Sequence, residues 1–388
     1  MEALCAEPED RVEFALHHLQ GGKYLQYGSV FSSTSDGALT AESFNVVVDQ
    51  TVADSSQSSG YTAQTRSVCQ RFTFEKKDVE GDVYYHILPL LRVDEEVKCV
   101  YRSEYRLVSE NGTVKVKEMT VSGVAVEDPT SGRWRLQQTA GGKYLIKNVS
   151  TGTYLNMENN AVCLTQQQPR STLWELKAIS LAMEKDYQQY TNTCGLASAR
   201  MILKYLRGTD TTDLEWLQSC HNVTNKVYDF TIAKIAQTMN AYLGTGPMYS
   251  VTGSSKSLMD FQELISNSIN QFYPLIVNNK PLEYIAQAEA FGYCYSQNAG
   301  GHYYVVKGLY YSDLNGYQAV INETHYKFGE VPLGRYDRET DSIESLDRER
   351  ITNNIGGRDV VVDYSMLHTV YSQSNHGVMY MNKTGGNS

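Results

Sequence analysis

The chain has 388 residues and lacks the long apolar run that a membrane-spanning helix needs. No stretch of about 18 apolar residues occurs, so no transmembrane helix is predicted. The first ten residues are acidic and contain no apolar core, which argues against a secretory signal peptide. Abundant Tyr, Ser, Thr and Asn are typical of extracellular bacterial enzymes and lectins. We therefore expect a secreted, mature chain with an added methionine, and the composition leaves a cytoplasmic location open.

Basic side chains are too few for a nucleic-acid-binding protein. The chain has 34 Lys plus Arg against 44 Asp plus Glu, which gives a formal net charge of -10. Proteins that bind a phosphate backbone present a basic face, so we expect no nucleic-acid partner. No CxxC or HxxxH spacing occurs either, so we expect no structural metal site and no cofactor.

The seven cysteines leave the redox state open. An odd number fits six paired or buried thiols plus one reactive thiol, as in an oxidising compartment. It fits equally well a cytosolic protein in which all seven are reduced. Cys220 and Cys294 are either a disulfide or two core thiols, and their spacing does not decide between them.

Residues 11–178 carry the pattern of an all-β region. Short alternating apolar runs are separated by Gly, Ser, Asn and Asp, and helical periodicity is absent. The sequence Gly-Gly-Lys-Tyr-Leu occurs at 21–25 and again at 141–145, which indicates an internal repeat. Aromatic residues close three apparent units, roughly 11–76, 82–138 and 142–178, at Phe72, Trp134 and Trp174.

Three sequential four-stranded units that each bury one aromatic residue would form a β-trefoil with pseudo-threefold symmetry. The third unit resembles the repeat of ricin-type lectins, from residues 144–157 to the closing Leu-Trp-Glu-Leu at 173–176. An intact Gln-x-Trp occurs nowhere. The resemblance implies a module that binds a glycan or another polymer, with a sugar pocket near the polar ends of a unit.

We expect a linker at residues 179–188, and helical periodicity begins after it. Residues 189–388 are therefore expected to form a second domain. Residues 1–10 are expected to be an acidic tail. The first predicted helix, 194–207, has basic residues in its last turn and ends before Gly208. Helices followed by antiparallel strands predict an α+β fold. Further helices are expected at 214–220, 231–243 and 257–272. Strands are expected at 274–277, 303–309 and 317–321, with a hairpin turn at 313–316 between the last two. A charged surface loop is expected at 330–350, and edge strands at 360–362 and 377–381.

A cysteine that opens a predicted helix and a distant histidine have the chemistry of thiol acyl transfer. The helix N-terminus favours the thiolate of Cys194, and the imidazole of His302 accepts and returns a proton. A third side chain must orient the imidazole. Asn322 and Glu323, at the end of the next predicted strand, are the candidates, and we rank Asn322 first. The backbone N–H of Cys194 and the side-chain amide of Gln188 would stabilise the oxyanion.

Residues 186–326 resemble the papain clan and, within it, the bacteriocin-leader-peptidase-like cysteine peptidases. A Gln precedes a Cys-Gly that opens a helix with Ala-Ser and Met at 194–201. A Pro-hydrophobic strand at 273–277 and a Gly-His followed by an apolar strand at 301–308 complete the pattern. The family usually has Asp-Pro where this chain has Asn322-Glu323. The resemblance implies a papain-like fold and a cysteine peptidase that acts on a protein or peptide.

Three functions are compatible with these features. The first is a cysteine peptidase, or a related amide-bond transferase, whose β-trefoil tethers it to a glycan or polymer. The second is a lectin-like binding protein with an inactive peptidase-like domain, because the third catalytic position departs from the family. The third is a cysteine toxin that deamidates or transamidates a protein with the same catalytic residues.

Overall fold

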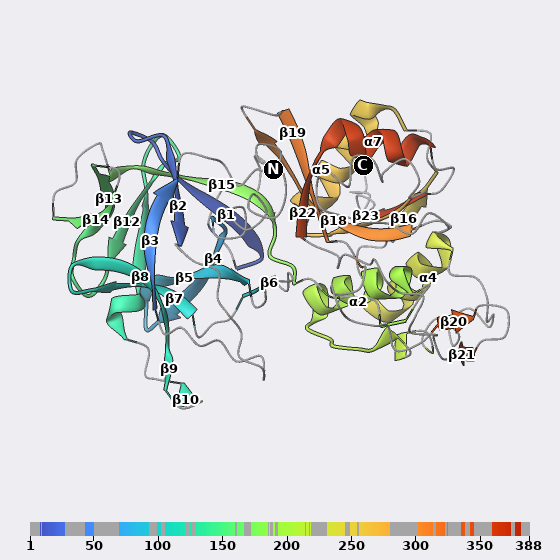
Figure 1. Cartoon of the computed structure of the whole chain (residues 1–388), viewed down its shortest axis with the longest axis horizontal. Helices are drawn as coiled ribbons and strands as arrows, with labels where there is room; N and C mark the ends of the chain where they lie inside the picture. Colours follow the sequence, from blue (N-terminus) through green and yellow to red (C-terminus); the bar gives the residue numbers. More distant parts are fainter. Residues whose placement is uncertain are drawn as a thin grey trace, which may run out of the picture. The chain divides into compact units, whose positions relative to one another are not determined.

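In the computed structural model the chain forms two compact units, an N-terminal unit that ends at Ala182 and a C-terminal unit that begins at Met183 (Figure 1). None of the helices described is long and apolar enough to cross a membrane. The structure describes residues 8, 10–27, 43–49, 70–92, 99–101, 105–121, 124–125, 129–159, 161–166, 172–184, 186, 189–190, 193–213, 215–216, 218, 231–244, 249–253, 256–279, 302–312, 316–322, 324, 335–337, 342–344, 359–373 and 377–381.

The N-terminal unit is strand-rich, as the alternating pattern predicts. Apart from one 3-10 turn, η3 (Thr130–Gly132), its described elements are β-strands. These are β1 (Val12–His18), β2 (Lys23–Tyr27), β3 (Ser43–Asp49), β4 (Phe72–Val79), β5 (Asp82–Arg92), β6 (Cys99–Tyr101), β7 (Tyr105–Glu110), β8 (Thr113–Glu118), β9 (Thr120–Val121), β10 (Val124–Ala125), β11 (Trp134–Gln138), β12 (Tyr144–Asn148), β13 (Tyr154–Glu158), β14 (Ala161–Thr165) and β15 (Trp174–Leu181).

A subset of these strands closes into a ring. β1 pairs with β15 and with β4, β4 with β5, β5 with β11, β11 with β12, and β12 with β15. Three hairpins, β2–β3, β7–β8 and β13–β14, extend from the same sheet. A closed ring leaves none of its own strands with an unpaired edge, so a β-rich region of this size can bury its apolar side chains inside.

The aromatic residues that close the predicted units lie in the core of the ring. Trp134 and Trp174 are fully buried, and so is Phe72. The indole N–H of Trp134 donates to the carbonyl of Leu107 (2.7 Å), and that of Trp174 donates to the carbonyl of Leu155 (3.0 Å). The same buried bond therefore recurs in two successive parts of the chain, as expected of a structural repeat.

The end of the N-terminal unit differs from the expected linker. Residues 179–181 continue β15, and after a bulge at Ile179 the last two pair with β1, Ser180 with Glu13 and Leu181 with Val12. Ile179 is 1% exposed and Leu181 is fully buried. Pairing with a strand at the other end of the unit, which no local pattern reveals, makes these residues part of the ring.

Glu75 gives the N-terminal unit a specific acid sensitivity. His86 Nδ1 lies 2.9 Å from Glu75 Oε2, and Lys77 Nζ donates to Oε1 at 2.7 Å. These bonds, the one from His86 above all, outweigh burial and lower the pKa of Glu75 to about 2. The pKa of a glutamate in the unfolded chain is about 4.3, so the lower pKa in the folded chain stabilises the fold at pH values above about 4.3. This stabilisation is lost as the pH falls towards about 2.

We therefore expect the free energy of unfolding to fall less between pH 4.5 and 2 in Glu75→Gln than in the wild type, by up to about 3 kcal/mol. Urea unfolding followed by tryptophan fluorescence across this range measures the effect. Asp82→Asn breaks an exposed pair with Arg135 (2.6 Å) and serves as the matched control, with wild-type pH dependence expected. An unchanged acid profile in Glu75→Gln would contradict the prediction.

The C-terminal unit contains an antiparallel sheet between two layers of helices. The strand order is β16-β23-β17-β18-β19-β22, with α2 and α4 on one face and α5 and α7 on the other (Figure 1). The elements are α2 (Cys194–Arg207), α4 (Ile232–Leu243), β16 (Tyr249–Thr252), α5 (Leu258–Asn270), β17 (Leu275–Asn279), β18 (His302–Ser312), β19 (Gly316–Asn322), the hairpin β20 (Arg335–Asp337) and β21 (Ser342–Glu344), β22 (Asp359–Asp363), α7 (Tyr364–Gln373) and β23 (Val378–Met381).

This unit differs from the sequence expectations in several places, and strand β16 was not predicted. The predicted loop at 330–350 contains the β20–β21 hairpin. Strand β23, expected at an edge, lies between β16 and β17, because partners distant in sequence flank it. Helix α7 was not predicted; its Tyr371 ring stacks on Phe261 of α5, with centroids 4.2 Å apart. Some predicted features lie outside the described residues: the turn at 313–315, part of the helix at 214–220, and the two cysteines Cys220 and Cys294.

Candidate active site

Helix α2 has the bounds that its sequence predicts, and Cys194 is its first residue. The side chain is a thiol and is 5% exposed. Gly208 ends the helix in the left-handed conformation (φ 66°), after Lys204 and Arg207 in the last turn. A sulfur at the first helical position lies at the positive end of the helix dipole, which favours the thiolate over the thiol.

His302 is the first residue of β18 and is 6% exposed. It pairs with Asn279 of β17, and its ring centroid lies 6.3 Å from that of Tyr304. Because side chains alternate along a strand, His302 and Tyr304 occupy one set of positions and Tyr303 and Val305 the other. Tyr303 and Val305 belong to the apolar cluster that contains Cys194.

The N-terminus of α2 packs directly on the start of β18. A Cβ added at Gly195 would lie 3.3 Å from Cδ2 of Tyr303 and 2.9 Å from Cδ1 of Ile235, so only glycine fits without a shift. Gly195 follows Cys194, and Tyr303 follows His302. The chain at Cys194 and the chain at His302, more than a hundred positions apart in the sequence, therefore adjoin one tight contact, and the side chain of β18 that faces α2 there is Tyr303.

Asn322 ends β19 and is fully buried. Its side-chain N–H groups donate to the carbonyls of Met183 (3.4 Å) and Glu184 (3.3 Å). Asn322 pairs with Val305 across the sheet, so its side chain shares the face of Val305 rather than that of His302. Of the other predicted site residues, Gln188 and Glu323 lie outside the described residues.

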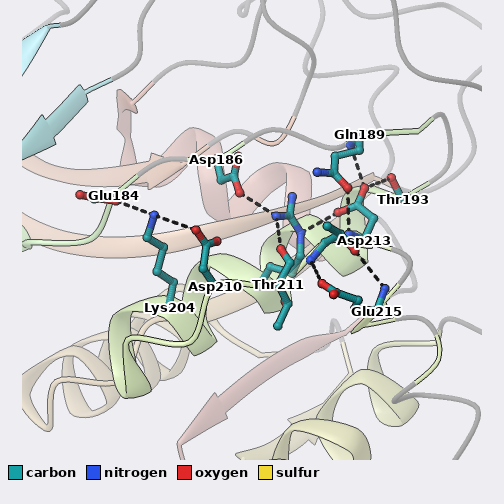
Figure 2. A network of polar contacts seen from close by, with 11 residues as sticks. Glu184, Asp186, Gln189, Thr193, Lys204, Asp210, Thr211, Asp213 and Glu215 are labelled. Carbon is teal, nitrogen blue, oxygen red and sulfur yellow. Dashed lines mark hydrogen bonds and ion pairs between the residues drawn. The ribbon is translucent and has the colours of Figure 1, made fainter.

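A buried ion pair that the sequence analysis did not predict lies beside the segment before Cys194 (Figure 2). Arg200 Nε donates to Asp213 Oδ1 at 2.7 Å, and the two side chains are 4% and 0% exposed. Arg200 Nη1 also donates to Asp186 Oδ2 (2.8 Å). Burial raises the pKa of Asp213, against the opposing effect of the Arg200 charge. The available signal was an arginine in the buried part of a helix, which requires a buried acceptor.

The described residues contain no group of three or more His, Cys, Asp or Glu side chains arranged to hold a metal ion. The thiol of Cys194 and the imidazole of His302 are groups of the kinds that act as nucleophile and as base. A thiolate at a helix N-terminus next to an imidazole can attack a carbonyl carbon and form a thioester.

A comparison with known protein families also points to the part of the chain that contains Cys194 and His302. Residues 181–341 match the model of the Peptidase_C39 like family. The matched stretch includes Cys194 and His302, and it confirms the predicted resemblance of this part of the chain to a peptidase family. No curated protein matches the chain.

Several solved structures are similar to part of the chain. "SeviL bound to asialo-GM1 saccharide" is 15% identical over 43% of this chain and 96% of its own, with a TM-score of 0.25. The designed 3-fold symmetric protein ThreeFoil is 18% identical over 42% and 96%, with a TM-score of 0.26. The cytolethal distending toxin from Actinobacillus actinomycetemcomitans is 14% identical over 44% and 92%, with a TM-score of 0.27. Similarity at this level assigns no ligand to this chain.

Proposed function

We propose that the C-terminal unit is a papain-like cysteine peptidase in which Cys194 is the nucleophile and His302 the general base and acid. The observation that carries the proposal is the close packing of Gly195 on Tyr303, because these two residues directly follow Cys194 and His302 in the chain. The match of residues 181–341 to a peptidase family supports it. The substrate is a protein or peptide.

In the proposed reaction, His302 takes the proton of the Cys194 thiol as the sulfur attacks the carbonyl carbon of the scissile amide. A C–S bond forms, and the carbonyl electron pair moves to oxygen. The backbone N–H of Cys194 and the amide of Gln188 donate to this oxyanion. The C–N bond then breaks, the leaving amine takes the proton from His302, and water hydrolyses the thioester with the same imidazole as base.

Labelling with iodoacetamide tests the pairing of sulfur and imidazole. We expect the alkylation rate of Cys194, followed by peptide mass spectrometry, to reach half its maximum well below the ordinary thiol pKa of about 8.5. In His302→Ala the midpoint should return towards that value. Cys163 is an internal control, because burial and the nearby Glu158 charge raise its pKa. Equal midpoints for Cys194 in the wild type and His302→Ala would refute the proposed pair.

For the third catalytic position we propose Glu323 rather than Asn322. The Asn322 amide nitrogen is committed to the carbonyls of Met183 and Glu184, its buried Oδ1 accepts no hydrogen bond from the described residues, and its side chain shares a face with Val305 rather than with His302. We expect Glu323→Gln to lower turnover about 100-fold with little change in melting temperature. Asn322→Ala should instead cost about 1–3 kcal/mol of stability, because buried carbonyls lose their donor. The opposite pattern, measured by kinetics and thermal unfolding, would return the role to Asn322.

Gly195→Ala tests how tightly α2 must approach β18. Alanine favours a helix by about 1 kcal/mol, so intrinsic propensity alone would stabilise the variant. Its Cβ would lie 2.9 Å from Ile235 Cδ1 and 3.3 Å from Tyr303 Cδ2, so we expect a small displacement of the helix end and about tenfold slower turnover. Gly253→Ala, where a Cβ meets open space, is the matched control. Wild-type turnover in Gly195→Ala would show that this contact does not position the reacting groups.

For the N-terminal unit we propose a β-trefoil that binds a glycan or polymer and raises the local substrate concentration. The ring of strands, the three hairpins and the repeated tryptophan–carbonyl bonds support this assignment. A secreted enzyme that acts at a glycan-bearing surface fits such a module. Full-length Cys194→Ala applied to a glycan array tests it, and an array without binding would reduce the unit to a spacer or a protein-binding module.

A binding protein with an inactive C-terminal unit is the second candidate. The burial of Cys194 and His302, 5% and 6% exposed, favours it, because a working nucleophile must reach its substrate. Slow labelling of Cys194 at neutral pH would support this alternative. A toxin-like deamidase or transamidase would show fast labelling and would transfer the acyl group to an added amine.

A further inference from the structure

We propose that Asp213 and Arg200 are positioning residues for the reaction at Cys194. The proposal rests on the proposed cysteine peptidase function. It concerns the short segment that leads into α2, which is held by these two side chains rather than by the usual helix cap (Figure 2).

Thr193 precedes the helix and is of the residue type that normally caps one. Its side chain makes no hydrogen bond to the first turn of α2. Its hydroxyl instead lies 2.5 Å from Asp213 Oδ2 and 2.7 Å from the carbonyl of Tyr190. The hydroxyl thus ties the residue before Cys194 to Asp213.

Asp213 also holds the other end of the same segment. Its Oδ2 accepts a hydrogen bond from the backbone N–H of Gln189 (2.7 Å), and its own backbone N–H donates to Gln189 Oε1 (3.0 Å). One buried carboxylate therefore fixes two points, Gln189 and Thr193. These points stand between the proposed oxyanion donor Gln188 and the nucleophile Cys194.

Arg200 joins this arrangement to the helix itself. Arg200 lies in the second turn of α2 and donates to Asp213, to Asp186 and to the carbonyl of Thr211 (2.8 Å). Charge-assisted bonds between buried groups are strong and geometrically demanding. Helix α2, Gln189 and Thr193 are therefore all tied to the chain at 211–213, which restrains the described residues on either side of the segment that leads into Cys194.

If Asp213 and Arg200 act by positioning, substituting them should slow reactions that form an oxyanion more than reactions that do not. An oxyanion must form in line with donors, and a displacement of about 1 Å costs on the order of 100-fold in rate. Alkylation by iodoacetamide forms no oxyanion. Acylation by p-nitrophenyl acetate does: the Cys194 sulfur bonds to the carbonyl carbon, the ester C–O bond breaks, and p-nitrophenolate leaves. The ratio of the two rates reports the placement of the donors separately from the reactivity of the thiolate.

The test compares Asp213→Asn and Thr193→Val with Lys204→Met in the full chain. An Asn side chain has one acceptor oxygen instead of two and cannot accept from Arg200 and from Gln189 and Thr193 together, so we expect acylation of Cys194 to fall about 100-fold, with alkylation within about twofold of wild type. Thr193→Val keeps the shape of the side chain and the Arg200–Asp213 pair, and should lower acylation about tenfold.

Lys204→Met removes two partly exposed ion pairs of the same helix, with Glu184 (2.9 Å) and with Asp210 (3.9 Å), neither of which involves residues 189–193. It should leave both rates unchanged, and Thr193→Ser, which keeps the hydroxyl, should retain wild-type acylation. If Asp213→Asn fails to fold, Thr193→Val decides. Acylation that is unchanged, or that falls only in proportion to alkylation, would overturn the positioning role. Failure of the proposed function is distinguishable, because the wild type itself would then show slow acylation and slow alkylation of Cys194.

Discussion

Cys194→Ala is expected to reduce amide hydrolysis on the order of 10⁶-fold, the cost of removing a nucleophile from a catalytic unit whose members act together. The fold should persist, because alanine is a good helix former and the replaced side chain is small. Casein digestion and the nitrophenolate burst both measure the loss, and circular dichroism checks the fold.

Cys163→Ala is the matched control for this experiment. Cys163 is also a thiol, lies in β14 of the N-terminal unit and is only partly buried. Its replacement should leave both hydrolysis and the burst unchanged. Turnover retained in Cys194→Ala, or lost equally in Cys163→Ala, would show that the reactive group has been assigned to the wrong sulfur.

Arg71→Met is expected to destabilise the N-terminal unit by about 3–5 kcal/mol. Arg71 Nη1 lies 3.1 Å from Glu13 Oε2, and both side chains are fully buried. The hydroxyl of Ser180 donates to the same carboxylate oxygen at 2.5 Å. Without the guanidinium, the buried carboxyl group loses the cation that it faces. Urea unfolding, followed by the fluorescence of the buried tryptophans, measures the cost.

The double variant Glu13→Leu/Arg71→Met should recover most of this loss, because an apolar pair of similar volume leaves no buried charge. Arg135→Met removes an exposed pair with Asp82, both side chains being about half exposed (54% and 47%), and should cost less than about 1 kcal/mol. A loss in Arg71→Met no larger than in Arg135→Met would mean that burial of the pair does not control its energetics.

Local signals in the sequence were sufficient for the elements that end on clear caps or alternate strictly. Helix α2 begins at Cys194 and ends before Gly208 as expected, because the apolar positions, the basic last turn and the glycine that follows it agree. Strands β18 and β19 follow from apolar runs on either side of a turn. The interior position of β23 and the β20–β21 hairpin could not be predicted from such signals. The partners of β23 are distant in the sequence, and β20 and β21 are too short to show a local periodicity.

By itself, the sequence determined that Cys194 starts a helix, that His302 leads a strand, and that a β-rich region precedes both. These properties depend on contacts within a few residues, which periodicity and capping encode. Only the tertiary structure decided that Gly195 packs on Tyr303 and that Asp213 holds the turn before Cys194. Such contacts join segments brought together by the burial of apolar faces, and the free energy of that burial belongs to the whole unit rather than to any window of the chain.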